Sequence, residues 1–515
     1  MSLKQKITGE LFYKFFQCPH WIWYDLYEDQ AKKTTIPPLM QMIFADGLRH
    51  DNKKEIISSG KQFKEIDPAL YKDLDEAFYA TLELMKQGEN IYRGVLMNEH
   101  WVGMPDLLER RPTAELGRGI KSNFGDYYYV VYDIKSHGYL RDEFKFQLVF
   151  YSLILERIQG IRPKQAYLIN AQGEELSFVV DDFVQQFDLN ISQIQKILDG
   201  EKPAPFLKSG CKRSPWYSIC LDEAQSCRDV SLIYRLNQMD QRQLYDIGIK
   251  TVDDFAAADL EVLRAQLESW PYDKLMRFHA QAQALVKNEF QVLKKSEFAE
   301  VDTEIYFDIE ADPTQDIDYL LGLLIVDKKG QKEIETPKGS RLNVKGNFGT
   351  GTYKYWFADN KLGEGENWRE FTDWLEKLEG SFVIYHYATY ERQVFDRLAM
   401  RYGTSGEITK KFHDHTVDIL RLVTDAVILP TYFYGLKDVA SHLGFKWRAA
   451  DAGSAESVVW YDDYLKIGNA EQKAKLRQKI VDYNEDDVRA TMLVKEWLAG
   501  QKPKTTREQV ELPED

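Results

Sequence analysis

The stretch EIYFDIEAD, residues 304–312, carries two carboxylates within a short run of apolar residues. The run predicts a strand, and side chains two positions apart on a strand project from the same face. Asp308 and Glu310 should therefore lie side by side. An isolated pair of this kind is commonly a solvated strand end, so its meaning depends on polar residues elsewhere in the chain.

Two later stretches offer partners for this pair. VDYNEDDVRATMLVKEWL, residues 481–498, has the pattern of an amphipathic helix that carries Tyr483 and Asp487 one turn apart. FVIYHYATYERQVFDRL, residues 382–398, predicts a strand that enters a helix, with Glu391 near the junction. Carboxylates that converge from separate elements can hold two divalent ions, one activating water and the other stabilising a leaving oxygen in phosphodiester hydrolysis.

This second half of the chain resembles the ribonuclease H-like fold of proofreading-type DEDD exonucleases, whose first motif is Asp-x-Glu on a strand and whose last is Tyr-x-x-x-Asp. The resemblance implies that Asp308, Glu310 and Asp487 ligate metal and that Tyr483 positions the attacking water. Glu391 stands where the family usually has Asp, and we expect it to be a further metal ligand. HTVDIL and YGLKDVASHLGFKW also resemble this fold, but no chemistry is assigned to them.

A second charged pair lies in the first half of the chain. Asp133 and Lys135 in YDIKS are two apart on a predicted strand, where a carboxylate can bind metal and an ammonium can face a scissile phosphate. Alone, such a pair is usually a solvated ion pair. It belongs, however, to an ordered series of motifs: GLRH with His50, GMPD with Asp106, DIK, and QLVFY with Gln147 and Tyr151.

This series resembles the RecB-family nucleases of the restriction-endonuclease-like fold, with their PD-(D/E)xK site, over about residues 10–230. The flanking FFQCP and a late cysteine triplet resemble the iron–sulfur branch of that family, which includes the CRISPR-associated exonucleases. The resemblance implies that His50, Asp106 and Asp133 ligate Mg²⁺ or Mn²⁺, with the carbonyl of Ile134 as a further ligand. It also implies that Lys135 is the catalytic lysine and that Gln147 and Tyr151 orient substrate or lysine.

The chain of 515 residues has four cysteines. Three of them crowd into GCKRSPWYSICLDEAQSC, residues 210–227, without the close pairs of a zinc ribbon. Four thiolates match the ligand count of a [4Fe–4S] cluster. The RecB-like layout of one early and three late cysteines implies a cluster on the whole set, Cys18, Cys211, Cys220 and Cys227. A zinc site that recruits His20 is the first alternative, and four unrelated thiols are the second.

Between the two halves, residues 228–296 have a helical pattern. LYDIGIKTVDDFA predicts two helices around Gly248, with Thr251 as the N-cap of the second. It resembles half of a helix-hairpin-helix, which contacts backbone phosphate, although a packing role is an equal alternative. A basic loop is a better candidate for phosphate contacts, with a solvated loop as the default alternative; its residues are Arg110, Arg111, Arg118 and Lys121.

The whole sequence predicts an α/β multidomain protein with a RecB-like domain at 1–227, a helical segment at 228–296, a ribonuclease H-like domain at 297–500 and a disordered tail at 501–515. The net charge of −15 argues against a protein that coats nucleic acid, but not against an enzyme with acidic metal sites. We find no leader or membrane-spanning pattern and expect a cytoplasmic protein.

Both halves in this order resemble a bacterial and archaeal family of RecB-like nucleases fused to a ribonuclease H-like domain. The resemblance implies a metal-dependent nuclease that acts on DNA, at single strands or ends, in repair, processing or defence. Because no phosphate-binding GxxxxGK[ST] motif is present, unwinding would need a helicase partner. The alternatives are a ribonuclease, a nuclease with one working site, and a nucleic-acid-binding scaffold with a degenerate second domain.

Overall fold

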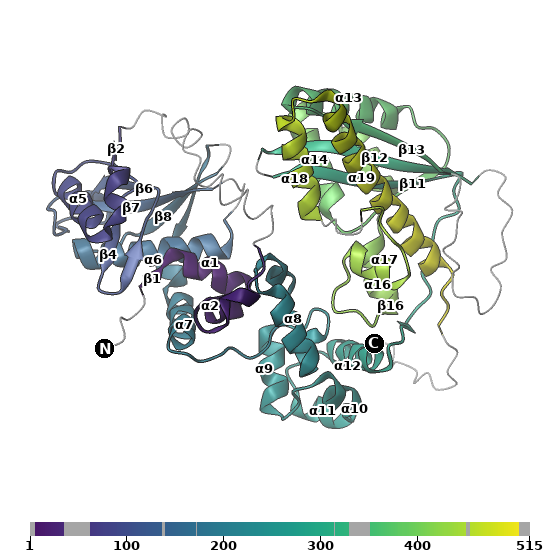
Figure 1. Cartoon of the computed structure of the whole chain (residues 1–515), viewed down its shortest axis with the longest axis horizontal. Coiled ribbons are helices and arrows are strands. Elements are labelled where there is room, and N and C mark those ends of the chain that lie inside the picture. Colours follow the sequence, from purple (N-terminus) through teal and green to yellow (C-terminus); the bar gives the residue numbers. More distant parts are fainter. Residues whose placement is uncertain are drawn as a thin grey trace. The chain divides into compact units, whose positions relative to one another are not determined.

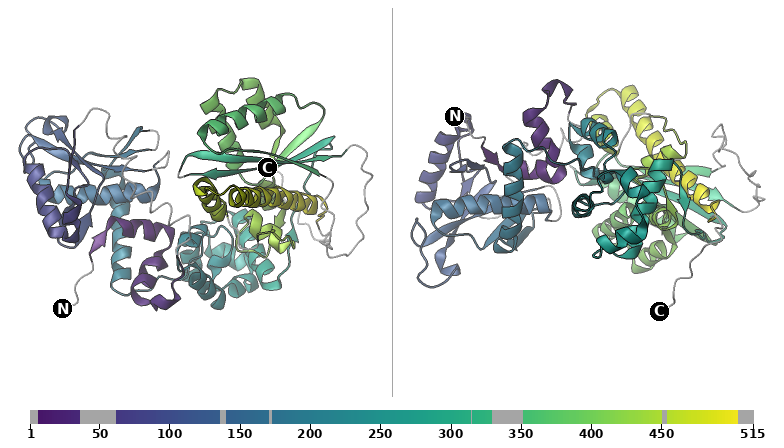
Figure 2. Two further views of the ribbon diagram at one scale, coloured as in Figure 1. Left: turned by 45° about the horizontal axis from the view of Figure 1, so that its top comes forward. Right: turned by 90° about the horizontal axis from the view of Figure 1, so that it is seen from below.

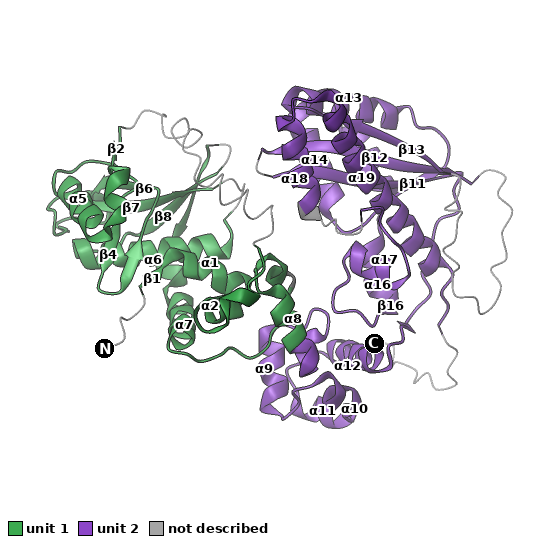
Figure 3. Cartoon of the chain, in the orientation of Figure 1, with its two compact units in different colours: residues 1–223 green, residues 224–515 purple. Residues whose placement is uncertain are grey.

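The computed structural model describes residues 6–35, 62–135, 140–170, 173–313, 315–328, 351–449 and 454–503. The chain divides into two compact units, Met1–Glu223 and Ala224–Asp515 (Figure 3). His50 and most of the predicted tail lie outside the described residues. Among the helices that are described, none is long and apolar enough to cross a membrane.

The first unit contains a six-stranded sheet in the order β2-β3-β6-β7-β8-β9 (Figure 1). The aromatic and β-branched run YYYVVYDI forms its buried strand β7, which pairs antiparallel with β6 and parallel with β8. The strand bounds are β2 Lys64–Glu65, β3 Ile91–Tyr92, β6 Leu107–Pro112, β7 Tyr127–Ile134, β8 Gln165–Ile169 and β9 Glu175–Val179.

Helices and a small three-stranded sheet surround this sheet. In the small sheet β4 and β5 form a hairpin, in which Asn98 pairs with Trp101 in antiparallel register. The helices are α1 Gly9–Gln17, α2 Pro19–Tyr27, α5 Leu74–Lys86, α6 Asp142–Gln159 and α7 Asp181–Leu198, and the small sheet comprises β1 Ile7–Thr8, β4 Leu96–Asn98 and β5 Trp101–Gly103. Short 3₁₀ turns of this unit occur at Gln30–Lys32, Pro68–Lys72, Thr113–Glu115 and Ser209–Arg213, and a further one at Val230–Leu232 belongs to the second unit.

The middle segment is helical, as its pattern predicts. Gly248 follows α9 with a φ of 87°, a left-handed conformation that suits glycine, and the Thr251 side chain caps α10 by accepting from the Asp254 amide. Helix α8 Tyr217–Ser226 precedes this segment, whose own helices are α9 Gln238–Asp246, α10 Val252–Ala257, α11 Leu260–Gln266 and α12 Tyr272–Lys287. After them, β10 Gln291–Val292 pairs with β16 Val427–Ile428.

The second unit is built on a five-stranded sheet in the order β13-β12-β11-β14-β15. Strand β11 lies at its centre, antiparallel to β12 and parallel to β14. The strand bounds are β11 Thr303–Asp312, β12 Ile317–Asp327, β13 Gly351–Phe357, β14 Phe382–His386 and β15 Thr416–Asp418.

Helices cover both faces of this sheet (Figure 2). Successive side chains of β11 point alternately to the two faces of the sheet. Ile305, Phe307 and Ile309 pack against α13, α14 and α15, whereas Tyr306 belongs to the core with α16, α17 and α19. The helices are α13 Lys361–Glu376, α14 Tyr390–Tyr402, α15 Gly406–His415, α16 Ile419–Ala426, α17 Leu436–His442, α18 Ser454–Lys466 and α19 Ala470–Ala499. Asp308 and Glu310 share the face of Tyr306, toward α19.

Candidate active site

Three carboxylates meet on the α19 face of the five-stranded sheet. Asp308 and Glu310 come from β11 and Asp487 comes from α19, and one oxygen from each lies within 4.8 Å of the others. Glu310 and Asp487 are only 6 % and 8 % exposed, whereas Asp308 is partly exposed. Elements that are far apart in the sequence thus deliver three carboxylates to one place, where their oxygens could hold a divalent cation.

The electrostatics of the cluster favour such an ion. Burial raises the pKa of Asp308, and the negative charges of Glu310 and Asp487 raise it further. Burial and Asp487 raise the pKa of Glu310 to about 8, and burial raises that of Asp487 to about 6. Three acids at this spacing repel one another when ionised, and a divalent cation among them would reduce that repulsion.

Asp308 is held by a hydrogen-bonded chain that the sequence motifs do not include. The Asn484 side-chain amide donates to Asp308 Oδ2 over 2.6 Å, and the Tyr353 hydroxyl donates to Asn484 Oδ1 over 2.7 Å. Gly322 lies opposite Asp308 in the β11–β12 pairing, and a Cβ there would come within 1.6 Å of Asn484 Oδ1. Glycine is therefore required at this position for Asn484 to reach Asp308.

The other two acids also accept hydrogen bonds. Ser457 Oγ donates to Glu310 Oε2, and Trp447 Nε1 donates to Asp487 Oδ1, each over 2.6 Å. Tyr483 lies one turn before Asp487 on α19 and is buried. Burial and the Asp487 charge raise the pKa of Tyr483, so its phenol stays protonated and can donate a hydrogen bond.

Glu391 lies in the first turn of α14, is buried, and is not one of the three clustered acids. Its Oε2 is 3.6 Å from Nδ1 of His386, at the end of β14. Burial raises the pKa of Glu391 although His386 opposes the shift. The Glu391 charge contributes to the raised pKa of Asp308, so the fourth predicted acid acts on the site electrostatically.

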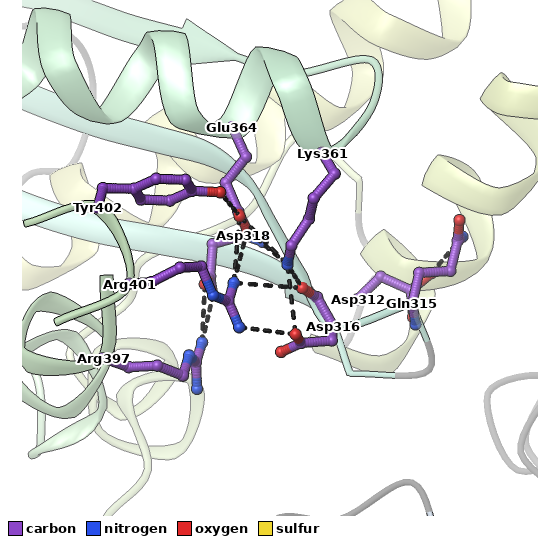
Figure 4. A network of polar contacts seen from close by, with 9 residues as sticks. All are labelled: Asp312, Gln315, Asp316, Asp318, Lys361, Glu364, Arg397, Arg401 and Tyr402. Carbon is purple, nitrogen blue, oxygen red and sulfur yellow. Dashed lines mark hydrogen bonds and ion pairs between the residues drawn. The ribbon is translucent and has the colours of Figure 1, made fainter. Parts of the chain in front are cut away.

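A polar network fixes the start of β12, next to the end of the strand that carries Glu310 (Figure 4). Arg397 donates to both oxygens of the buried Asp318, over 2.7 and 2.8 Å. The Asp318 amide donates to Glu364, which is 1 % exposed and receives Arg401 at 3.1 Å. Because these bonds join α13 and α14 to the β11–β12 connection, they hold the strand end that positions Glu310.

The first unit brings together the described members of its own motif series. Lys135 pairs with Asp133 at the end of β7, and the Ile134 amide donates to Asp106 Oδ2 over 2.8 Å. Burial raises the pKa of Asp133 to about 6 against the effect of Lys135, and Asp106 adds to the increase. Burial lowers the pKa of Lys135, but the two acids reverse the shift, so its ammonium stays charged.

Gln147 and Tyr151 lie one turn apart on α6, and the Gln147 amide donates to the Tyr151 hydroxyl over 2.7 Å. Burial raises the pKa of Tyr151, and the negative charges of Asp133 and Asp106 raise it further. A Cβ at Gly103 would meet the Tyr151 ring at 2.7 Å, so this glycine of the GMPD motif leaves room for the tyrosine. His50 cannot be placed, because it lies outside the described residues.

Three cysteines of the first unit share one apolar cluster. Cys18, Cys211 and Cys220 pack with Trp21, Tyr24 and Trp216. Cys18 Sγ lies 3.8 Å from Cys220 Sγ, and a ring nitrogen of His20 joins both sulfurs within 4.8 Å. Cys227, directly after α8, is exposed, and the four cysteines form no disulfide.

The candidate phosphate contacts differ from the prediction in one respect. Arg110 and Arg111 lie on β6 and not in the loop, because this segment pairs with β7 through Pro112. Arg111 is held by Glu109 at 3.1 Å and by the Tyr132 hydroxyl at 2.8 Å. Arg118 and Lys121 are exposed in the connection that follows. Of the four, Arg111 is thus the least available to a ligand.

Comparison with protein families matches residues 305–499 to the model of the RNase_H superfamily. No curated protein matches the chain. Residues 305–499 form a ribonuclease H-like domain. This confirms the fold predicted for the second half, and the five-stranded sheet with β11 at its centre is consistent with it. The match contains all three clustered acids, so the domain is of a nuclease type with an acidic group suited to Mg²⁺ or Mn²⁺.

Proposed function

We propose that the chain is a metal-dependent nuclease whose ribonuclease H-like domain hydrolyses phosphodiester bonds at Asp308, Glu310 and Asp487. The observation that carries this proposal is the meeting of these carboxylates within 4.8 Å in a domain that matches the RNase_H superfamily. DNA, as single strands or ends, is the proposed substrate on the resemblance described above, and RNA is the alternative.

The three acids would hold Mg²⁺ or Mn²⁺, which supplies Lewis acidity and lowers the pKa of a bound water. The residues around them perform the remaining tasks. Asn484, Ser457 and Trp447 each fix one carboxylate by a hydrogen bond of 2.6 Å. The protonated Tyr483 phenol would orient the attacking water from the next turn of α19.

We also propose a second hydrolytic site in the first unit, with Asp106, Asp133 and His50 as metal ligands and Lys135 as the catalytic cation. Its support is the contact of Lys135 with Asp133, the nearby Asp106, and the Gln147–Tyr151 pair whose tyrosine is influenced by both acids. A charged ammonium beside a metal-binding carboxylate can stabilise the developing charge on a phosphate. The surface residues Arg118 and Lys121 are proposed phosphate contacts.

For the cysteines we propose a structural metal centre, with a [4Fe–4S] cluster on Cys18, Cys211, Cys220 and Cys227 as implied by the iron–sulfur RecB-like layout. One specific observation favours the zinc alternative. Two thiolates on a tetrahedral zinc with bonds of about 2.3 Å lie about 3.8 Å apart, which is the separation of Cys18 and Cys220. His20 supplies a nitrogen in the same place.

The test is digestion of end-labelled single-stranded DNA, duplex DNA and RNA by the full chain with Mg²⁺ or Mn²⁺. We expect Asp308→Asn to lower one metal-dependent activity by on the order of 100-fold or more, and Asp133→Asn to lower another. Asp373→Asn, on the exposed side of α13, is the matched control and should cleave like wild type. A wild-type chain that binds these substrates and leaves all of them intact would instead be a scaffold.

A further inference from the structure

Lys437 lies beside the acidic cluster of the ribonuclease H-like domain, on α17. Its ammonium stands 4.7 Å from the ring centre of Tyr483 and 5.4 Å from that of Trp447. Trp447 donates its indole N–H to Asp487 Oδ1 over 2.6 Å, and Tyr483 precedes Asp487 by one turn on α19. The Lys437 ammonium therefore lies against the rings of two residues that neighbour the predicted metal ligand Asp487.

The position of this charge is unusual for a lysine near acids. Among the described residues, no carboxylate lies within the 4.0 Å of an ion pair with Lys437. Its charge nevertheless lowers the pKa of both Glu310 and Asp487, so the ammonium is close to the cluster without being neutralised by one member of it. Burial lowers the pKa of Lys437 against the effect of these acids.

We propose that Lys437 is a catalytic residue of the ribonuclease H-like domain, whose ammonium contacts a non-bridging oxygen of the phosphate that is cleaved. The inference rests on the proposed nuclease function of Asp308, Glu310 and Asp487. In phosphodiester hydrolysis the water oxygen bonds to phosphorus while the bond to the leaving oxygen breaks, and the transition state spreads negative charge over the non-bridging oxygens. A cation that aromatic rings hold in place can stabilise this charge without first breaking an ion pair.

A simpler role for Lys437 would be to balance the three acids and keep them folded in place. The two roles predict opposite effects on metal binding. If Lys437 contacts phosphate, its removal takes a positive charge away from the metal ligands, so Mn²⁺ should bind as tightly as before or more tightly while cleavage slows. If Lys437 only maintains the site, its removal should weaken Mn²⁺ binding and cleavage together.

Lys354 provides a matched control in the same domain. It lies on β13 with its ammonium 4.6 Å from the Trp356 ring centre and 5.6 Å from that of Trp374, and like Lys437 it is partly buried. Its two rings belong to the other side of the fold, in the core with α13. Replacing it removes the same kind of lysine contact without touching the acidic cluster.

The experiment compares Lys437→Ala, Lys437→Arg and Lys354→Ala in full-length protein that also carries Asp133→Asn, so that the first unit does not contribute. Steady-state cleavage of end-labelled DNA and RNA with Mn²⁺ gives kcat and KM, and calorimetric titration gives Mn²⁺ affinity. We expect Lys437→Ala to lower kcat about 100-fold, with Lys437→Arg recovering part of the loss and Lys354→Ala equal to the parent. Mn²⁺ affinity should not fall.

Each other outcome overturns the inference at a distinct step. A Lys437→Ala variant that cleaves like Lys354→Ala shows that the lysine takes no part. Joint loss of Mn²⁺ binding and cleavage in Lys437→Ala, with no recovery in Lys437→Arg, shows a structural role. A further comparison adds Asp308→Asn to the Asp133→Asn parent. If this addition does not lower cleavage, the proposed function of the domain fails, and the role of Lys437 fails with it.

Discussion

The Asn484 side-chain amide lies 2.6 Å from Asp308 Oδ2, and Gly322 leaves the space that this contact occupies. The hydrogen bond joins α19 to the central strand at the point where the acids meet. The Tyr353 hydroxyl donates to the Asn484 amide oxygen over 2.7 Å, so hydrogen bonds at both the nitrogen and the oxygen set the orientation of this amide. Preorganisation of Asp308 thus depends on a residue that would not bind metal itself.

Gly322→Ala should lower Asp308-dependent cleavage and reduce the free energy of unfolding by about 1–3 kcal/mol, since the added Cβ overlaps Asn484 Oδ1 and must displace it. Thermal unfolding and cleavage rates check both effects. Gly406→Ala is the control, because a Cβ there meets nothing within 4 Å. Equal behaviour of the two variants would show that Asn484 can move away without cost.

The sequence predicts the acids of this site better than their surroundings. A strand period of two and a helix period of nearly four place Asp308, Glu310, Tyr483 and Asp487 on definite faces, and these periods hold in the structure. Asn484 and Lys437 were not predicted, since a single amide or lysine has no periodic signal. Their roles depend on which segments pack against α19, which local spacing does not specify.

The pKa of Glu310, raised from 4.5 to about 8, predicts how stability depends on pH without metal. Between these values the folded state holds a proton that the unfolded state has lost, so the free energy of unfolding falls as pH rises through that window. We expect Mn²⁺ to offset the fall, giving a larger increase in Tm at high pH than at low pH.

Thermal unfolding across this pH range, with and without Mn²⁺, measures the effect. Glu310→Gln removes the titrating group and should flatten the metal-free dependence. An equal increase in Tm with Mn²⁺ at every pH would contradict proton–metal competition at Glu310.

Glu391→Gln should weaken metal binding more than it slows the metal-saturated enzyme. Glu391 lies outside the three-acid cluster, yet its charge acts on Asp308, so neutralising it reduces the attraction for a cation without removing a clustered ligand. Raising the Mn²⁺ concentration should restore most of the cleavage rate in Glu391→Gln but not in Asp487→Asn. Failure to recover at any Mn²⁺ concentration would make Glu391 a direct ligand instead.

Gly103→Ala should impair only the first unit. The new Cβ would come within 2.7 Å of the Tyr151 ring and 3.1 Å of Ile154, which should shift Tyr151 away from Gln147. We expect the Asp133-dependent cleavage to fall and the Asp308-dependent cleavage to stay unchanged, as measured in Asp308→Asn and Asp133→Asn backgrounds respectively. Loss of both activities would mean that the two sites depend on each other.

The nature of the cysteine centre can be decided by two substitutions that differ in effect. A [4Fe–4S] cluster needs all four thiolates, so Cys227→Ser should lower iron content while His20→Ala leaves it unchanged. A zinc ion at Cys18, Cys220 and His20 predicts that His20→Ala lowers zinc content while Cys227→Ser leaves it unchanged. The reason is that the His20 ring nitrogen already lies within 4.8 Å of both sulfurs. Elemental analysis and visible absorption of anaerobically purified protein distinguish the two, with about four irons per chain expected for the cluster. Protein that contains neither metal would leave the buried thiols with a packing role alone.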